Sequence, residues 1–162
     1  MLYDHYHFAW KHALAQTLAW REEKRSIVFT NGCFDLLHPG HMDYLKSAHA
    51  LGDVLIIGLN TDESIRALKG EKRPVNALED RDAMLSALRW VDAVIPFSQE
   101  TPLELIRYLR PDVLAKGGDY TIESMVGSSD VLGWGGDACT IPFKEGYSSS
   151  QLIQRICGLY AA

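Results

Sequence analysis

The fold is decided by the stretch SIVFTNGCFDLLHPGH, residues 26–41, which passes from a strand through a loop into a helix. Residues 26–30 are rich in β-branched and aromatic side chains, as a short strand requires. Asn31-Gly32 then opens a loop that runs to His38. From Pro39 to residue 51 the apolar spacing is helical, and proline suits a first helical turn because it has no amide hydrogen to lose there.

The rest of the chain repeats this alternation of strand and helix. Further strands are predicted at residues 54–59, 93–97, 113–115 and 138–141, and helices at 7–23, 61–68, 78–89, 102–110 and 149–158. We therefore predict an α/β fold, a Rossmann-like, doubly wound sheet of five parallel strands with helices on both faces. Such sheets bind ligands at the carboxyl ends of their strands, where strand order reverses. The loop 31–38 follows the first strand directly.

A single domain fits the length of 162 residues. We predict that residues 1–25 form a leading helix packed on a domain of residues 26–162. The expected apolar face of this leading helix consists of Phe8, Ala9, Leu14, Ala15, Leu18 and Ala19. A subunit interface formed by this helix is the alternative to a role in covering the sheet. The glycine-rich residues 127–136 are expected to form a surface loop.

Charge and cysteine content argue against several classes of protein. The 16 basic and 21 acidic residues give a net charge of -5, which argues against a nucleic-acid partner bound by a general basic field. No stretch approaches the roughly 20 apolar residues of a membrane span, and no signal peptide is evident. The three cysteines are widely separated and contain no Cys-x-x-Cys pair, as in a cytoplasmic protein with free thiols. We expect a soluble cytoplasmic protein with no membrane partner.

Two histidines, His38 and His41, flank Pro-Gly at the start of the helix predicted from Pro39. The free amides and the dipole of a helix start favour an anion, so two imidazoles there can hydrogen-bond phosphate oxygens. An isolated pair of this kind is more often a surface or capping feature. A zinc site is not favoured, because no third ligand lies at a recognisable spacing, and we predict no metal ligands in this chain.

In its context, however, the segment TNGCFDLLHPGH, residues 30–41, resembles the signature of the cytidylyltransferase-like nucleotidyltransferase superfamily. The resemblance implies that His38 and His41 act on the nucleotide phosphates as catalytic residues. It also implies a nucleotide-binding set of Cys33, Phe34, Asp35 and Gly40. Cys33 and Phe34 are expected to contact nucleotide through their backbone. Asp35 is expected to orient the loop, and a purely structural role for it stays open.

A second segment, LKGEKRPV at residues 68–75, is followed by Glu79-Asp80-Arg81. Alone, a basic run of this kind is usually a solvated face. Related transferases carry lysines here that reach the phosphates, and an arginine shortly afterwards. The resemblance therefore implies catalytic roles for Lys72 and Arg81 and adds Lys69 and Arg73 as further candidate cations.

Two later segments complete the resemblance, KGGDY at residues 116–120 and EGYSSS at 145–150. Alone, the first is an ordinary turn and the second a helix cap. The resemblance implies that both approach the nucleotide, and it adds Lys116, Gly117, Asp119, Ser148, Ser149 and Ser150 to the binding set. Many relatives have arginine where this chain has Phe143, followed here by Lys144, so the cationic contact at that position is unassigned.

Together the four segments are most similar to the adenylyltransferase domain of ADP-heptose synthases, over about residues 27–156. The resemblance implies that ATP and D-glycero-β-D-manno-heptose 1-phosphate give ADP-heptose and pyrophosphate, with Mg²⁺ as cofactor, in lipopolysaccharide precursor synthesis. A phosphate acceptor is already ionised near neutral pH and needs no strong general base. The chain has no room for the sugar kinase domain of bifunctional members, so it resembles the stand-alone form. Family members commonly associate, so a homo-oligomer is an expected partner state.

Two alternatives stay open at this point. A cytidylyltransferase acting on glycerol phosphate or another polyol phosphate shares every phosphate-binding feature named above. A nucleotide-binding regulatory module that has lost catalysis is the alternative from another class of protein. Base choice depends on pocket contacts that spacing does not reveal.

Overall fold

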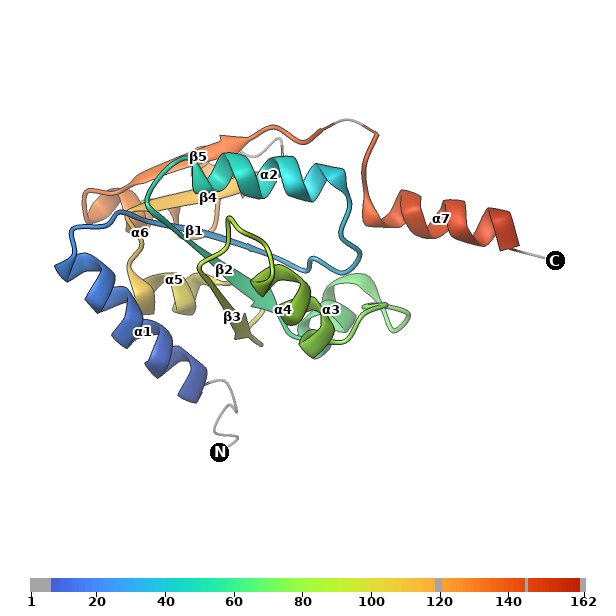
Figure 1. Ribbon diagram of the computed structural model, residues 1–162, viewed down its shortest axis with the longest axis horizontal. Helices are drawn as coiled ribbons and strands as arrows, with labels where there is room; N and C mark the ends of the chain where they lie inside the picture. The colour runs from blue at the N-terminus through green and yellow to red at the C-terminus, as the bar shows by residue number, and fades with distance from the viewer. Residues whose placement is uncertain (1–6, 119–120, 145, 161–162) are drawn as a thin grey trace.

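The computed structural model describes residues 7–118, 121–144 and 146–160. Its centre is a five-stranded parallel sheet in the order β3-β2-β1-β4-β5 (Figure 1). The strands are β1 (Ile27–Gly32), β2 (Val54–Asn60), β3 (Ala93–Phe97), β4 (Val113–Gly117) and β5 (Asp137–Ile141). The predicted doubly wound α/β fold is confirmed, and every predicted strand lies within about two residues of its expected place.

Helices cover both faces of the sheet (Figure 1). They are α1 (His7–Glu22), α2 (Pro39–His49), α3 (Asp62–Lys69), α4 (Leu78–Ser86), α5 (Leu103–Leu109), α6 (Ser128–Gly133) and α7 (Ser149–Tyr160), with a short 3-10 turn η1 (Ile122–Ser124). Alternate strand residues feed two cores, because successive side chains of a strand point to opposite faces. Ile27 and Phe29 join the core under α1, α5 and α6. Val28 joins the core under α2 and α4.

The leading helix α1 packs on α5 and β3, but not through the predicted face. Trp10, Thr17 and Trp20 are buried, whereas Leu18 is 50% exposed. The Trp10 indole also donates from Nε1 to the Pro96 carbonyl at 2.9 Å. Burial of the Trp10 and Trp20 indoles removes far more apolar surface from water than burial of the alanines of the predicted face would. The two tryptophans therefore determine which face of α1 packs against the domain. The side chain of Phe8 lies outside the described residues.

The prediction of a surface loop at residues 127–136 was wrong, because α6 lies within it. Val131 and Ser128 are buried, and Val131 belongs to the same hydrophobic core as the buried leucines and isoleucine of α5. Gly127, with a φ of 87°, stands immediately before the helix. The segment looked like a loop because its glycines outnumber its apolar residues, and only contact with the sheet reveals the buried turn.

Strand order reverses between β1 and β4, which makes their carboxyl ends the expected binding point of the sheet. Tyr44 of α2 ties these two strands together, since its buried hydroxyl bonds the Thr30 hydroxyl and donates to the Ala115 carbonyl. Helix α7 leaves this edge and extends away from the sheet, with no buried residue (Figure 1). None of the helices in the described part of the chain combines the length and apolar character needed to cross a membrane.

Candidate active site

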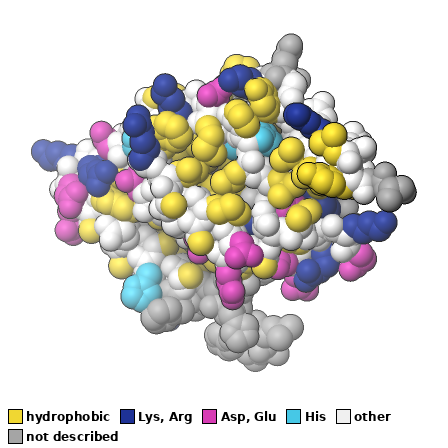
Figure 2. Space-filling view, turned by 45° about the vertical axis from the view of Figure 1, so that its right-hand side comes forward, with side chains coloured by type: hydrophobic (Ala, Val, Ile, Leu, Met, Phe, Trp, Pro, Cys, Tyr) yellow, Lys and Arg dark blue, Asp and Glu magenta, His cyan; other side chains and the backbone are white. Residues whose placement is uncertain are grey.

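A cleft of about 530 Å³ lies at the carboxyl ends of β1 and β4. Its walls come from the loop after β1, from α2, from the segment after α3, from the residues that follow β3, and from the ends of β4 and β5. A second hollow of about 260 Å³ adjoins it and shares His41, Tyr44, Lys69, Phe143 and Ser149 with it. In Figure 2, a histidine side chain in the upper part of the view is surrounded by hydrophobic side chains, and lysine and arginine side chains lie nearby.

His38 and His41 face each other at the start of α2. His38 is the N-cap residue, and Pro39 occupies the first turn. The two imidazole rings stack with centroids 3.8 Å apart and an interplanar angle of 21°. On one side of this pair, the ring centroid of Phe34 lies 5.3 Å from that of His41. On the other side, the ring centroid of Tyr147 lies 6.2 Å from that of His38. Neither Nδ1 atom has a hydrogen-bond partner among the described residues, so stacking positions these rings.

Burial keeps both imidazoles uncharged near neutral pH. It lowers the pKa of His41 to about 4, with smaller contributions from His38 and Lys69 in the same direction. Burial also lowers the pKa of His38. A neutral imidazole still donates one hydrogen bond, and an anion beside it raises its pKa by favouring the charged form. The pair is therefore suited to stabilise negative charge as it arrives or develops.

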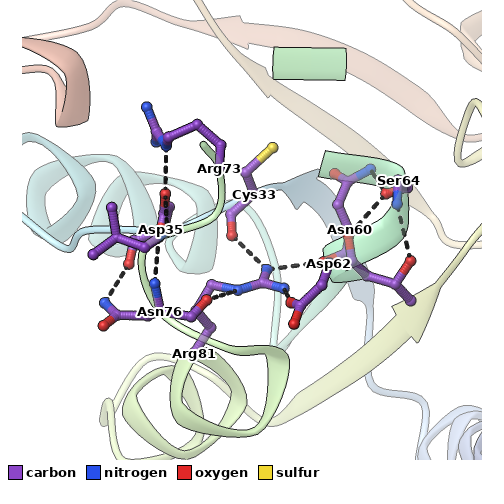
Figure 3. Close-up of polar contacts among 10 residues, drawn as sticks. Cys33, Asp35, Asn60, Asp62, Ser64, Arg73, Asn76 and Arg81 are labelled. Atoms are coloured by element: carbon purple, nitrogen blue, oxygen red, sulfur yellow. Dashed lines mark hydrogen bonds and ion pairs between the residues drawn. The ribbon is translucent and has the colours of Figure 1, made fainter. Parts of the chain in front are cut away.

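Asp35 holds the segment after α3 against the loop after β1 (Figure 3). Its carboxylate accepts hydrogen bonds from Arg73 Nε at 2.6 Å and from the amides of Val75 and Asn76 at 2.8 and 2.9 Å. Burial alone would raise the pKa of Asp35, but these two amides and the Arg73 guanidinium outweigh it and lower the pKa. Asp35 thereby orients Arg73, which lines the cleft.

Two helix starts border the second hollow, those of α2 and α7. Ser148 accepts a hydrogen bond from the amide of Gln151 at 3.1 Å and so caps α7. Ser149 donates to the Leu36 carbonyl at 3.1 Å, which joins this helix to the loop after β1. All three serines, 148 to 150, line the hollow together with His38 and Gly40. Because helix starts attract anions, this hollow is suited to phosphate groups.

A family model described as Cytidylyltransferase-like matches residues 29–155 of this chain. The chain belongs to the cytidylyltransferase-like family. The predicted superfamily resemblance is thus confirmed.

Similar proteins include curated relatives from several bacteria. The Bifunctional protein HldE of Methylobacillus flagellatus is 51% identical over 143 residues, which are 88% of this chain and 29% of the relative. The Bifunctional protein HldE of Marinomonas sp. is 54% identical over 80% of this chain and 27% of its own length. The cytidylyltransferase-like chain thus spans less than a third of these relatives.

Among solved structures, the lipopolysaccharide core biosynthesis protein of Thermoplasma volcanium aligns with a TM-score of 0.61 and 27% identity. The alignment covers 76% of this chain and 99% of that protein.

The structure brings most of the predicted binding residues of this cytidylyltransferase-like chain to the two hollows. The residues that line them include Cys33, Phe34, Asp35, His38, Gly40, His41, Lys69, Arg73, Lys116, Gly117, Ser148, Ser149 and Ser150. Burial lowers the pKa of Lys116, which donates to Asn31 Oδ1 at 3.0 Å across the point where strand order reverses. Asp119 lies outside the described residues, as does Glu145.

Arg81, predicted as a catalytic residue, lines neither the cleft nor the second hollow. Its side chain is fully buried and donates to the carbonyls of Cys33, Asn60 and Asn76 and to the Asp62 carboxylate (Figure 3). All these acceptors belong to the protein, so the guanidinium acts as a link between the loop after β1, the end of β2 and α4. Its spacing from the basic run could not distinguish a buried link from a phosphate ligand.

Lys72 is exposed on the turn between α3 and α4 and lines neither hollow. Its contact with phosphate stays a prediction. Arg73, one of the further candidate cations from the sequence, is directed from the turn to the cleft, because Asp35 holds its Nε.

The sequence did not single out two aromatic residues of the site, Tyr44 and Tyr147. Tyr44 stands three residues after His41 and therefore on the same face of α2, a helical spacing that could have indicated it. Tyr147 comes to His38 from more than a hundred residues away, so no local pattern could have shown it. Lys144 pairs with Asp43 of α2 at 2.7 Å and fastens the segment that carries Tyr147.

The buried imidazoles make stability depend on pH. Unfolded histidine has a pKa of about 6.5, whereas that of folded His41 is about 4. Between these values the unfolded chain binds the proton and the folded chain does not, so the free energy of unfolding falls as pH falls. We expect a loss of about 1–2 kcal/mol between pH 7.5 and 5 from this residue. Urea unfolding at both pH values measures it.

His41→Gln is the matched variant, because glutamine keeps an amide donor but does not titrate. It should lose less stability than the wild type over the same pH range, and the remaining slope includes the contribution of His38. An identical pH slope in both proteins would contradict the burial of a neutral imidazole at position 41.

Proposed function

We propose that this chain transfers AMP from ATP to heptose 1-phosphate, releasing pyrophosphate and forming ADP-heptose. The observation that carries the proposal is the hollow where the stacked imidazoles of His38 and His41 meet the starts of α2 and α7. Identity near 50% to the HldE relatives supports this choice of substrates, as does the structural similarity to a lipopolysaccharide core biosynthesis protein. A cytoplasmic location accords with the three free thiols.

In this reaction a phosphate oxygen of the sugar attacks the α-phosphorus of ATP, and the bond from that phosphorus to the bridging oxygen of the β-phosphate breaks. Both leaving-group charge and acceptor charge must then be held in one cleft. The amides at the start of α2, the two imidazoles and Lys69 supply donors and positive charge toward the phosphates. No side chain needs to remove a proton, because the acceptor oxygen is already ionised.

Mg²⁺ fits this site as a companion of ATP. Among residues 7–118, 121–144 and 146–160, no group of three His, Cys, Asp or Glu side chains is arranged to hold a metal ion. The Asp35 carboxylate is occupied by Arg73 and two amides. Phosphate oxygens would therefore provide most of the ligands, as they often do for Mg²⁺. The ion would neutralise phosphate charge during transfer.

Pyrophosphate release tests the proposal. The purified chain is supplied with ATP or CTP, each with heptose 1-phosphate, with glycerol 3-phosphate or without an acceptor. We expect kcat/KM for ATP with heptose 1-phosphate to exceed that of every other pair by on the order of 100-fold. A preference for CTP with glycerol phosphate would replace the proposal with a cytidylyltransferase. Nucleotide binding without turnover on any acceptor would indicate a regulatory module.

A further inference from the structure

Phe143 is an exposed aromatic side chain at the junction of the two hollows. It follows the end of β5, and 63% of its surface is exposed. It lines both the cleft and the second hollow, as His41 and Lys69 do. A large apolar ring that stays in water beside a phosphate-binding hollow is not explained by packing of the core.

The inner side of this ring lies against the paired glycines at the end of β4. A Cβ atom added to Gly117 would meet the ring at 2.5 Å, and one added to Gly118 would meet it at 2.8 Å. Only residues without a side chain allow this approach. The ring of Tyr44, on α2, also supports Phe143. The two ring centroids are 6.4 Å apart, and the interplanar angle is 59°. The ring is thus held from one side and open to the cleft.

The other aromatic side chains among the described residues that line the cleft offer no such surface. Phe34 is 5% exposed and Tyr44 is 6% exposed. Both are covered by the protein, whereas a nucleotide base needs an open ring face for stacking. Among the phenylalanine, tyrosine and tryptophan residues that line the cleft in the described chain, Phe143 is therefore the one that presents its ring to a ligand.

The geometry points to Phe143 as the platform on which the adenine ring of ATP stacks while the triphosphate lies at His41 and Lys69. This inference rests on the proposed transfer from ATP and assigns the base to a place in the cleft. A purine covers more of a phenyl ring than a pyrimidine does, and stacking strength grows with overlap. Phe143 thereby contributes to the choice of ATP over CTP.

Binding measurements without an acceptor test this role. The affinities of ATP, CTP and inorganic tripolyphosphate are measured by calorimetry for the wild type, Phe143→Ala and Phe143→Trp. Phe143→Ala should raise the Kd of ATP about tenfold and that of CTP less, since stacking is typically lost at this scale. Phe143→Trp should keep the affinity for ATP. Tripolyphosphate has no base, so its Kd should stay within about twofold in every variant.

Tyr160 provides a matched control, because it is an aromatic residue that is 82% exposed and lines neither hollow. Tyr160→Ala should bind all three ligands as the wild type does. Unchanged ATP affinity in Phe143→Ala would overturn the inference. Equal losses of ATP and tripolyphosphate would also overturn it, since they would show that Phe143 only supports the phosphate site. If the wild type binds tripolyphosphate but transfers no AMP, the proposed function is removed. The stacking role of Phe143 is still decided in that case by comparing the ATP affinities of the wild type and Phe143→Ala.

Discussion

His41→Ala should lower kcat for pyrophosphate release about 100- to 1,000-fold, the usual loss when one preorganised donor to developing charge is removed. His41 is the inner ring of the stacked pair and contacts both hollows, so its donor lies where the triphosphate is proposed to bind. Alanine removes the donor and also an inner ring from the row formed by Phe34, His41, His38 and Tyr147. The loss should therefore fall mainly on kcat, with a smaller rise in the KM for ATP.

His49→Ala provides the control for this prediction. His49 is the last residue of the same helix, lies near Asp92 with 3.9 Å between Nδ1 and Oδ2, and lines neither hollow. It should keep wild-type kcat and KM. Steady-state kinetics combined with the Kd of ATP separate the two contributions of His41. A His41→Ala protein that is folded and retains most of the wild-type kcat would show that the imidazole does not act on the reacting phosphates.

Arg81→Met should lower the free energy of unfolding by about 3–5 kcal/mol, because three carbonyl groups lose their donor and a partly buried ion pair is broken. The substitution leaves the Asp62 carboxylate without its partner at 2.7 Å, and the carbonyls of Cys33, Asn60 and Asn76 without their donor. Methionine fills much of the same volume, so the loss reports the polar contacts and not a cavity. A domain of this size has a total stability of about 5–15 kcal/mol, so the variant should be close to unfolding at 37 °C.

Urea unfolding of Arg81→Met is compared with that of Arg66→Met, which changes an exposed arginine of α3. Arg66→Met should stay within about 0.5 kcal/mol of the wild type. ATP affinity is then measured at a temperature at which both variants are folded. A link role predicts a large loss of stability, whereas a phosphate ligand would lose affinity at unchanged stability. The second result would restore the catalytic role that the resemblance implied for Arg81.

His41 and Arg81 show where inference from the sequence was strong and where it was not. His38 and His41 are three residues apart in one helix start, so a local pattern determines how they meet. Arg81 has partners 48, 21 and 19 residues away, at Cys33, Asn60 and Asp62. Which of these it contacts depends on how β1, β2 and α4 are packed, and a basic residue on a helix shows the same local pattern in either role.

The same distinction explains the corrections within the fold. The strands and their order along the chain were predictable from one continuous apolar run at residues 54–59 and from shorter β-rich runs that alternate with helical stretches. The face that α1 buries was not, since alanines, leucines and tryptophans mark competing faces of one helix and the sheet selects the tryptophans. A short helix such as α6 carries too few residues for its periodicity to be read beside its glycines.

The sequence by itself determined the parallel α/β architecture, the helix start at His38 to His41 and the four segments that mark the family, because each is encoded within a few consecutive residues. Only the tertiary structure decided that Arg81 is a buried link, that Asp35 directs Arg73 to the cleft, and that Phe143 lies open on Gly117 and Gly118. These roles arise from contacts between segments far apart in the chain. Burial and long-range pairing, which set the charge and accessibility of each group, exist only once those segments have packed together.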